Sequence, residues 1–338
     1  MDLQAASVHP RTAVISGRCL RIALLAVFAF LGSARSASVQ EWPQRPVKII
    51  VPYAPGGNSD GIGRVIAQNL TEAFGQPFLV ENRPGASGAI AAEVVARSPA
   101  DGYTLFLASL TQMAIMPAAM KTSFDPLKDF VPISAVSTNS LVLVVHPSLP
   151  VKSVADFLAF ARSQRGQLTY AAVGVGSITH LAMALFLKRA GIEMTPVMYK
   201  GGAPAMTDLI AGHVKAQFAI AASVIPYARG DMVRLLAVSA EQRIPQIPNV
   251  PTLIESGYPG FRLLNWTGLV APTGTPMPVI DRIAAEVSRA MEKPKTVAWL
   301  TANGIDPLEI TREEFAAIIA ADIPLWREAV AIAGIREN

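Results

Sequence analysis

The chain contains a single cysteine, Cys19, among its 338 residues. Cys19 lies in an N-terminal segment that we expect to be removed. The mature chain would then contain no thiol, which excludes disulfide bonds, thiol catalysis and cysteine-bound metals. Cys19 also precedes the apolar stretch, whereas the acceptor cysteine of a lipoprotein would follow it.

Histidine is also scarce, and no pattern of metal ligands is present. The four histidines, His9, His146, His180 and His213, are scattered along the chain. None forms a His-x-x-x-His pair, and no acidic cluster accompanies them. We therefore expect neither a metal site nor a cofactor.

Charge is also sparse: 16% of the residues are charged and 51% are hydrophobic, a globular composition. Residues 1–38 hold four arginines and one aspartate, which leaves 25 basic and 24 acidic residues in the remainder. A nearly neutral protein offers no electrostatic attraction for nucleic acid. The length is sufficient for two domains of ordinary size.

The N-terminus carries an uncharged apolar run of eleven residues. Arg18 and Arg21 precede residues 22–32, and small residues follow at 33–38. This order of basic, apolar and small residues is typical of a secretory signal peptide. A membrane-spanning anchor needs about 20 apolar residues. We predict that residues 1–38 are a cleaved signal peptide, cut after position 36, 37 or 38, and that the product is exported.

Two glycine-rich turns lie about 120 residues apart, and each follows an apolar, strand-like run. The first is Pro55-Gly56-Gly57-Asn58-Ser59-Asp60, and the second is Gly174-Val175-Gly176-Ser177-Ile178-Thr179. Each is predicted to lead from a strand into a helix. Unpaired amides and the positive end of a helix dipole suit a negatively charged ligand. Two such turns suggest two lobes that close on one small anion.

Strand-like and helix-like segments alternate along the rest of the chain, which predicts an α/β fold with largely parallel sheets. The expected strands are 47–51, 78–80, 104–108, 168–173, 194–199, 214–220 and 233–239. The expected helices begin near residues 58, 87, 153, 179, 204, 277 and 311. Two longer apolar segments, 131–146 and 261–271, can cross between lobes. We predict lobe 1 from residues 39–141 plus 264–338, and lobe 2 from residues 142–263.

Capping signals place several of these helices more closely. Asn58 or Ser59 can cap the first helix, which Gly75 can end. Ser153 and Thr311 each stand at the start of a capping-box pattern.

A series of motifs resembles one known family. The segment from Trp42 through Pro52-Tyr53-x-Pro55-Gly56-Gly57-x-x-Asp60 resembles the mature start of substrate-binding proteins of tripartite tricarboxylate transporters, also called Bug proteins. Further matching motifs follow in the same order, at residues 75–77, 80–86, 99–105, 144–153, 199–201, 235–239, 250–252 and 268–276. The resemblance covers about residues 41–335.

The resemblance implies a fold like that of the periplasmic binding proteins of type 2, with two lobes joined by two crossing strands, as in a Venus flytrap. It implies a periplasmic protein, a monomer, that closes on a small carboxylate. The implied partner is a membrane permease with a large and a small subunit. In such proteins backbone amides and waters from both lobes typically hold the ligand carboxylate.

The chain departs from the family pattern at Ala219. Many relatives carry an aspartate there, within a Phe-Asp-Asn stretch, whereas here Ala219 follows Phe218. Alanine cannot pair with a ligand ammonium group. We therefore favour a di- or tricarboxylate, or an apolar or aromatic carboxylate, over an amino acid.

The expected ligand-binding residues lie in the two turns and after the third strand. They are Tyr53, Gly56, Gly57, Asn58, Ser59, Asp60, Ser109, Thr111, Gly174, Gly176, Ser177, Thr179 and His180. Asp60 has a structural alternative in capping, and His180 in packing or capping. Lys200 is placed either at the rim of the cleft or in solvent, and Asn265 and Trp266 either beside the hinge or in the core.

Enzymatic activity has little support in the sequence. Residues 85–88 fall short of the nucleophile elbow Gly-x-Ser-x-Gly. We interpret the protein as a solute receptor. The alternatives are an extracytoplasmic sensor of the same fold and, least favoured, a secreted hydrolase with a triad assembled across distance.

Overall fold

The computed structural model describes residues 42–228 and 230–334, so the predicted signal peptide lies outside the described residues. The chain divides into a short unit, Met1–Gln44, and a large unit, Arg45–Asn338. In the short unit, the Trp42–Pro43 peptide bond is cis. Within the described ranges, no helix combines the length and apolar character that a membrane crossing requires.

The first part of the sheet in the large unit is built around β1 (Val47–Val51). This strand pairs in parallel with β2 (Phe78–Asn82) and with β3 (Thr104–Ser109). On the other side of β3 lies β9 (Leu264–Pro272), which runs antiparallel to it. The strands β1, β3 and β9 consist mainly of apolar and β-branched residues, and their side chains are almost all buried.

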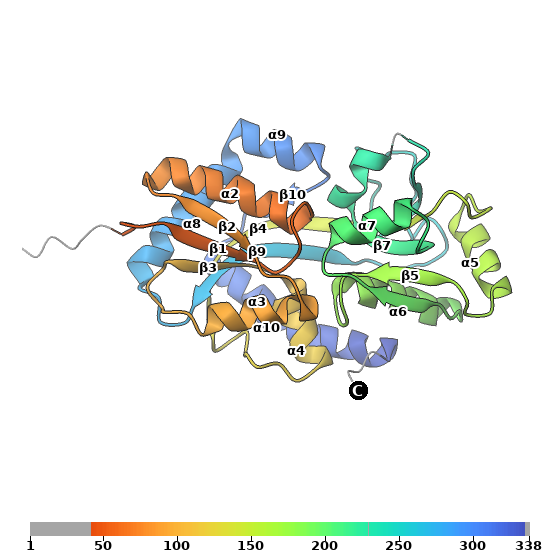
Figure 1. Ribbon diagram of the computed structural model, residues 1–338, viewed down its shortest axis with the longest axis horizontal. Helices are drawn as coiled ribbons and strands as arrows, with labels where there is room; N and C mark the ends of the chain where they lie inside the picture. The colour runs from red at the N-terminus through yellow and green to blue at the C-terminus, as the bar shows by residue number, and fades with distance from the viewer. Residues whose placement is uncertain (1–41, 229, 335–338) are drawn as a thin grey trace, which may run out of the picture. The chain divides into compact units, whose positions relative to one another are not determined.

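One long strand, β4 (Phe130–Val145), continues from this part of the sheet into the second (Figure 1). From Phe130 to Ser140 it pairs with β9. From Leu141 to Val145 it pairs instead with β7 (Ala216–Ile220) and β8 (Arg234–Val238). A second parallel group completes this part, in which β5 (Thr169–Ala172) lies between β7 and β6 (Thr195–Met198).

The prediction of largely parallel sheets is wrong in this central region. The strands β4 and β9 run antiparallel to each other, and each runs antiparallel to its other neighbours. The physical reason is that these two strands carry the chain out and back, so they point in opposite directions. The predicted α/β class holds, with a mixed sheet. The lobe boundaries stay a prediction, which the change of β4 partners at Ser140 and Leu141 supports.

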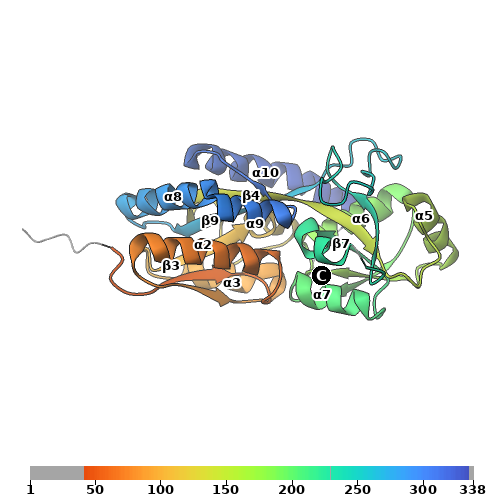
Figure 2. The same ribbon diagram turned by 90° about the horizontal axis from the view of Figure 1, so that it is seen from above.

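Helices cover both faces of the sheet (Figures 1 and 2). Over the first part, α2 and α8 pack on one face, and α3 and α10 on the other. The bounds are α2 (Asn58–Phe74), α3 (Ala89–Ala96), α4 (Met116–Ala119), α5 (Val154–Ser163), α6 (Ile178–Ala190), α7 (Gly202–Ile210), α8 (Met277–Glu292), α9 (Pro294–Ala302) and α10 (Arg312–Ala333). A two-residue strand, β10 (Asp306–Pro307), pairs with β4.

Most predicted helix ends are confirmed. Gly75 ends α2 in the left-handed conformation, Ser153 caps α5, and Thr311 opens α10 with a complete capping box. Two predictions are wrong. The cap of α2 is Gly57 and not Asn58 or Ser59, so those two side chains are not used for capping. The helix expected from position 87 begins at Ala89, after the short turn η1 (Ala86–Gly88), because Ser87 has a φ of 54°.

Candidate ligand site

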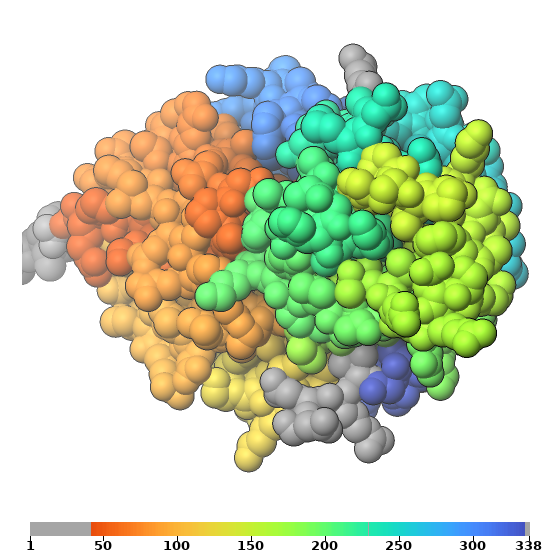
Figure 3. Space-filling view, turned by 45° about the vertical axis from the view of Figure 1, so that its right-hand side comes forward, coloured from red at the N-terminus to blue at the C-terminus, as the bar shows by residue number. Residues whose placement is uncertain are grey.

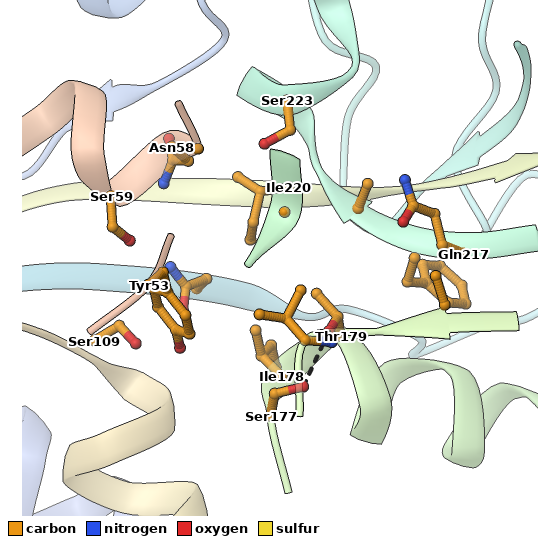
Figure 4. Close-up of a pocket in the computed structure, with 17 residues that line it drawn as sticks. Tyr53, Asn58, Ser59, Ser109, Ser177, Ile178, Thr179, Gln217, Ile220 and Ser223 are labelled. Carbon is orange, nitrogen blue, oxygen red and sulfur yellow. Dashed lines mark hydrogen bonds between the residues drawn. The ribbon is translucent and has the colours of Figure 1, made fainter. Parts of the chain in front are cut away.

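A cavity of about 60 Å³ lies where the two groups of strands meet, at the carboxyl ends of the parallel strands (Figure 4). By the same measure one water molecule needs about 10–15 Å³, so the space suits a ligand of a few polar groups. Open α/β sheets bind ligands at this end. The lining residues are Tyr53, Gly57, Asn58, Ser59, Ser109, Ala171, Val173, Ser177, Ile178, Thr179, Gly202, Gln217, Phe218, Ala219, Ile220, Ser223 and Asn265.

Three helices begin at this cavity. Gly57 precedes α2, Ser177 precedes α6, and Gly202 is the first residue of α7. The amides of a first helical turn have no partner within the helix, and the helix dipole places positive potential there. Three such ends directed at one small space make it favourable for an anion.

Some of these amides already have partners, and others do not. The Ile178 amide donates to the Thr111 hydroxyl at 3.2 Å, and the His180 amide donates to the Ser177 hydroxyl at 3.2 Å. Among the described residues, the amides of Asn58, Ser59 and Thr179 have no such partner. These amides remain able to donate to a bound molecule.

The side chains around the cavity are polar or apolar but uncharged: the described lining contains no Asp, Glu, Lys, Arg or His. In Figure 4, Tyr53, Asn58, Ser59 and Ser109 lie on one side and Ser177, Thr179 and Gln217 on the other. The positive potential of the site therefore comes from the backbone and not from a basic side chain.

Asp60 lies behind the cavity wall and holds the first turn in place. Its carboxylate accepts a hydrogen bond from the Gly56 backbone amide at 3.0 Å and one from the Asn82 side-chain amide at 3.0 Å. It also accepts two hydrogen bonds from the Arg64 guanidinium group. Burial alone would raise the pKa of Asp60, but the hydrogen bonds from Arg64, Gly56 and Asn82 outweigh it and lower that pKa below its usual value. Asp60 is therefore ionised, and both of its carboxylate oxygens already accept hydrogen bonds from the protein.

The second turn has a similar buried support. The Gly176 amide donates to Nδ1 of His180 at 3.3 Å, and the His180 ring stacks on Tyr170. Burial lowers the pKa of His180 to about 4, so the imidazole is neutral near pH 7. Since Nδ1 accepts a hydrogen bond, the proton lies on Nε2. His180 shapes the turn from behind.

The structure brings together seven of the thirteen predicted site residues in the cavity lining: Tyr53, Gly57, Asn58, Ser59, Ser109, Ser177 and Thr179. It places Gly56, Asp60, Thr111, Gly176 and His180 behind that lining, in supporting contacts. Gly174 lines a neighbouring cavity of about 320 Å³, together with Lys200 and Tyr199. A direct contact between these residues and a ligand stays a prediction.

Other lining residues were not predicted from the sequence. Gly202 follows the strand β6 as Gly57 follows β1, and the same rule of strand, glycine and helix could have identified it. Gln217 and Ser223 come from β7 and the turn after it. No spacing distinguishes them from ordinary strand and loop residues. Asn265 lines the cavity, whereas Trp266 points away and donates to Asp322 at 2.7 Å.

Beside the site, direct contacts join segments that are far apart in the sequence. The Ala54 amide donates to the Lys200 carbonyl at 3.1 Å, and the Ser87 hydroxyl donates to the Val175 carbonyl. In Figure 3, the orange surface of the part of the chain near residues 50–100 meets the green surface of the part near residue 200, around α7. Gly174 permits this approach, because a Cβ atom there would lie 2.3 Å from the Ser87 hydroxyl oxygen.

The chain is similar in sequence to known proteins. A family model described as "Tripartite tricarboxylate transporter family receptor" matches residues 62–334. The chain is 34% identical over 318 residues to Protein BugT of Bordetella pertussis, covering 93% of this chain and 98% of that one.

Solved structures share the fold. The R. palustris protein Rpa4515, solved with adipate, is 34% identical with a TM-score of 0.84, covering 88% of this chain and 99% of the other. MatC from Rhodopseudomonas palustris, with bound malate, is 31% identical with a TM-score of 0.82, covering 86% and 100%. The periplasmic binding protein BugD is 29% identical with a TM-score of 0.85, covering 88% and 100%. The predicted periplasmic-binding-protein fold is confirmed by these matches.

Proposed function

The chain belongs to the family of tripartite tricarboxylate transporter receptors, which are periplasmic solute-binding receptors, and we propose from this that it captures a small carboxylate for a membrane permease. The ligand would be a di- or tricarboxylate, or an aromatic carboxylate. The closed form would deliver it to a permease with a large and a small subunit. The protein acts as a monomer and does not transform its ligand.

The observation that carries this proposal is the convergence of α2, α6 and α7 on a cavity without charged side chains. A carboxylate gains hydrogen bonds from the unpaired amides and a favourable dipole interaction there. A cation would find neither a carboxylate partner nor a favourable potential. The structural neighbours with adipate and malate support the same class of ligand.

The residues that β7 contributes to the cavity lining disfavour ligands with an ammonium group. Ala219 and Ile220 present methyl and methylene groups, and Gln217 presents an uncharged amide. None of these can neutralise an ammonium group. We therefore expect aspartate and glutamate to bind more weakly than succinate, malate, adipate or benzoate.

The test is thermal unfolding of the protein recovered from the periplasm and refolded to remove any bound molecule. Each of these acids, with citrate, aspartate and glutamate, is added in turn. A ligand at 100 times its Kd stabilises the folded state by about 2.7 kcal/mol, which raises Tm by several degrees. We expect such a shift with at least one acid that lacks an ammonium group. If none of the acids in this panel shifts Tm, the proposal is wrong.

The matched variant is Gly57→Leu. Gly57 has an ordinary φ of −89°, and a Cβ atom there would meet nothing closer than the Ala54 carbonyl at 3.8 Å. A Cβ atom is therefore tolerated, and it faces the Gly202 and Ala203 amides at the start of α7 at 3.9 and 4.0 Å. We expect the rest of the leucine side chain to fill the space between α2 and α7. We expect Tm without ligand to change little and the shift with the acid to disappear.

A further inference from the structure

Gln112 is a buried polar side chain directly behind the cavity wall. It lies in the short helix η2 (Thr111–Ile115), after β3, and is fully buried. Its amide makes four hydrogen bonds. The Oε1 atom accepts from the Ser109 amide at 3.0 Å and from the Ser109 hydroxyl at 2.8 Å. The Nε2 group donates to the Tyr53 hydroxyl at 2.9 Å and to the Ser87 carbonyl at 2.7 Å.

The orientation of this amide is determined by its backbone partners. A backbone amide such as that of Ser109 can only donate, and a carbonyl such as that of Ser87 can only accept. Reversing the Gln112 amide would place two donors together and two acceptors together. The directions of the two remaining hydrogen bonds, to the Tyr53 and Ser109 hydroxyls, are therefore fixed as well.

The two hydroxyls acquire opposite characters in consequence. Tyr53 accepts from Gln112, so its own hydrogen is left to donate to another group. The Ser109 hydroxyl donates its hydrogen to Gln112, so toward another group it can only accept a hydrogen bond. Both residues line the cavity.

We propose that Gln112 is a positioning residue that makes Tyr53 a hydrogen-bond donor and Ser109 an acceptor toward the ligand. This inference rests on the proposed carboxylate function. It assigns a carboxylate oxygen to Tyr53 and a hydroxyl group of the ligand to Ser109. The cavity then fits a carboxylate that carries a neighbouring donor better than one that carries a neighbouring acceptor.

The same side chain connects the cavity wall to the hydrogen bond between Ser87 and Val175. Ala86 and Ser87 have φ values of 44° and 54°, which are unusual for residues other than glycine. Gln112 holds the Ser87 carbonyl in this turn, and the Ser87 hydroxyl donates to Val175 on the opposite side. Gly88 is required beside it, because a Cβ atom there would lie 2.5 Å from Nε2 of Gln112.

The first experiment is a double-mutant cycle with Tyr53→Phe and Gln112→Glu, with malate binding measured by calorimetry. Phenylalanine removes the donor, and a hydrogen bond to a charged group is worth roughly 10- to 100-fold in affinity. In an ionised glutamate, an oxygen that can only accept replaces the Nε2 donor. The Tyr53 hydroxyl then donates its hydrogen to position 112 and no longer to the ligand. We expect Gln112→Glu to weaken binding strongly in the native background and much less in the Tyr53→Phe background.

A merely structural role for Gln112 would give a different result, because its loss would then cost the same factor in both backgrounds. That outcome, or unchanged binding by Tyr53→Phe, would overturn the proposal. Thermal unfolding of each variant verifies folding. If Gln112→Glu does not fold, Gln112→Met, which is uncharged and of similar length, replaces it in the same cycle. Methionine neither donates to the Tyr53 hydroxyl nor competes strongly for its hydrogen, so we expect a smaller loss of affinity, again larger in the native background than in the Tyr53→Phe background.

The second experiment tests Ser109 with three acids of equal length: malate, succinate and freshly prepared oxaloacetate. They carry a hydroxyl donor, a methylene and a carbonyl acceptor at the same carbon. We expect malate to bind at least several-fold more tightly than the other two, and Ser109→Ala to reduce that preference. Equal binding of malate and oxaloacetate would overturn the inference. If malate fails but another acid of the panel binds, the inference is wrong and the proposed function stands.

Discussion

At the scale of single residues, the site depends on buried groups that do not line the cavity. Asp60, Gln112 and His180 each hold a backbone or hydroxyl group of the wall from behind. The protonation states of Asp60 and His180 are set by their surroundings, which keep Asp60 ionised and His180 neutral. The lining itself can therefore remain uncharged.

His180 predicts a pH dependence of stability. Its pKa is lowered to about 4 in the folded protein, from the ordinary value of 6.5. The unfolded chain therefore binds a proton between these values, which the folded chain does not. Above pH 6.5 the histidine is neutral in both states and its burial carries no penalty from ionisation. As the pH falls from 6.5 toward 4, protonation favours the unfolded chain and lowers the free energy of unfolding, by about 3 kcal/mol at most.

The measurement is urea unfolding of the native protein and of His180→Gln at pH 7, 6, 5 and 4. Glutamine offers an acceptor to Gly176 but does not titrate in this range. We expect the native protein to lose more stability than the variant as the pH falls. Parallel curves for the two proteins would contradict the prediction.

At the scale of elements, local sequence signals account for the ends of helices. In α10, the Thr311 hydroxyl accepts the Glu314 amide at 3.1 Å, while the Glu314 carboxylate accepts the Thr311 amide at 2.8 Å. This capping box satisfies two donors that the helix leaves unpaired. Because α10 packs against β4, α6 and η2, its start affects the whole large unit.

We predict that Thr311→Ala lowers the free energy of unfolding by about 1 kcal/mol. The measurement is equilibrium unfolding in urea. The matched control is Ser288→Ala, which removes an exposed hydroxyl in the middle of α8, where no cap is formed. The control should change by less than about 0.5 kcal/mol. Equal effects of the two changes would show that the cap is not stabilising.

The elements that the sequence predicts well are those with a distinct pattern. The apolar β1 and β3, the amphipathic α2 with its glycine end, and the crossing strand β4 are each marked by composition or periodicity. The segment η2 is not, because all of its residues are buried and no polar face gives it a helical period.

The candidate site divides in the same way. The turns at Gly57 and Ser177 follow from local signals of strand, glycine and helix. The partners of Gln112 do not, because Tyr53 and Ser87 lie 59 and 25 residues away along the chain. Only the folded sheet brings them together, so a lone glutamine in an apolar run gives no sign of its role.

At the scale of the whole large unit, a few contacts between segments distant in sequence join the two sides of the cavity. Ser87 donates to the Val175 carbonyl, and Thr111 accepts the Ile178 amide at 3.2 Å. Each contact can exist only when the two sides approach. A ligand that bridges the same sides would therefore shift the population toward the closed form.

We predict that Ser87→Ala combined with Thr111→Val favours the open form. Without ligand, small-angle X-ray scattering should give a larger radius of gyration for the double variant than for the native protein. Binding of the preferred acid should weaken by about ten-fold or more, because part of the binding energy now drives closure. The control is Thr122→Ala, whose hydroxyl bonds only within its own turn. An unchanged radius and affinity would contradict the prediction.

The proposed binding of the carboxylate by main-chain amides has a consequence for how the sequence can change. No replacement other than proline removes a backbone donor, so a substitution that leaves the cavity open would keep the capacity to hold a carboxylate. The side chains at Gln217, Ala219, Ile220 and Ser223 are then free to change. A receptor built in this way can be redirected from one acid to another by a few substitutions, without first losing the ability to bind acids at all.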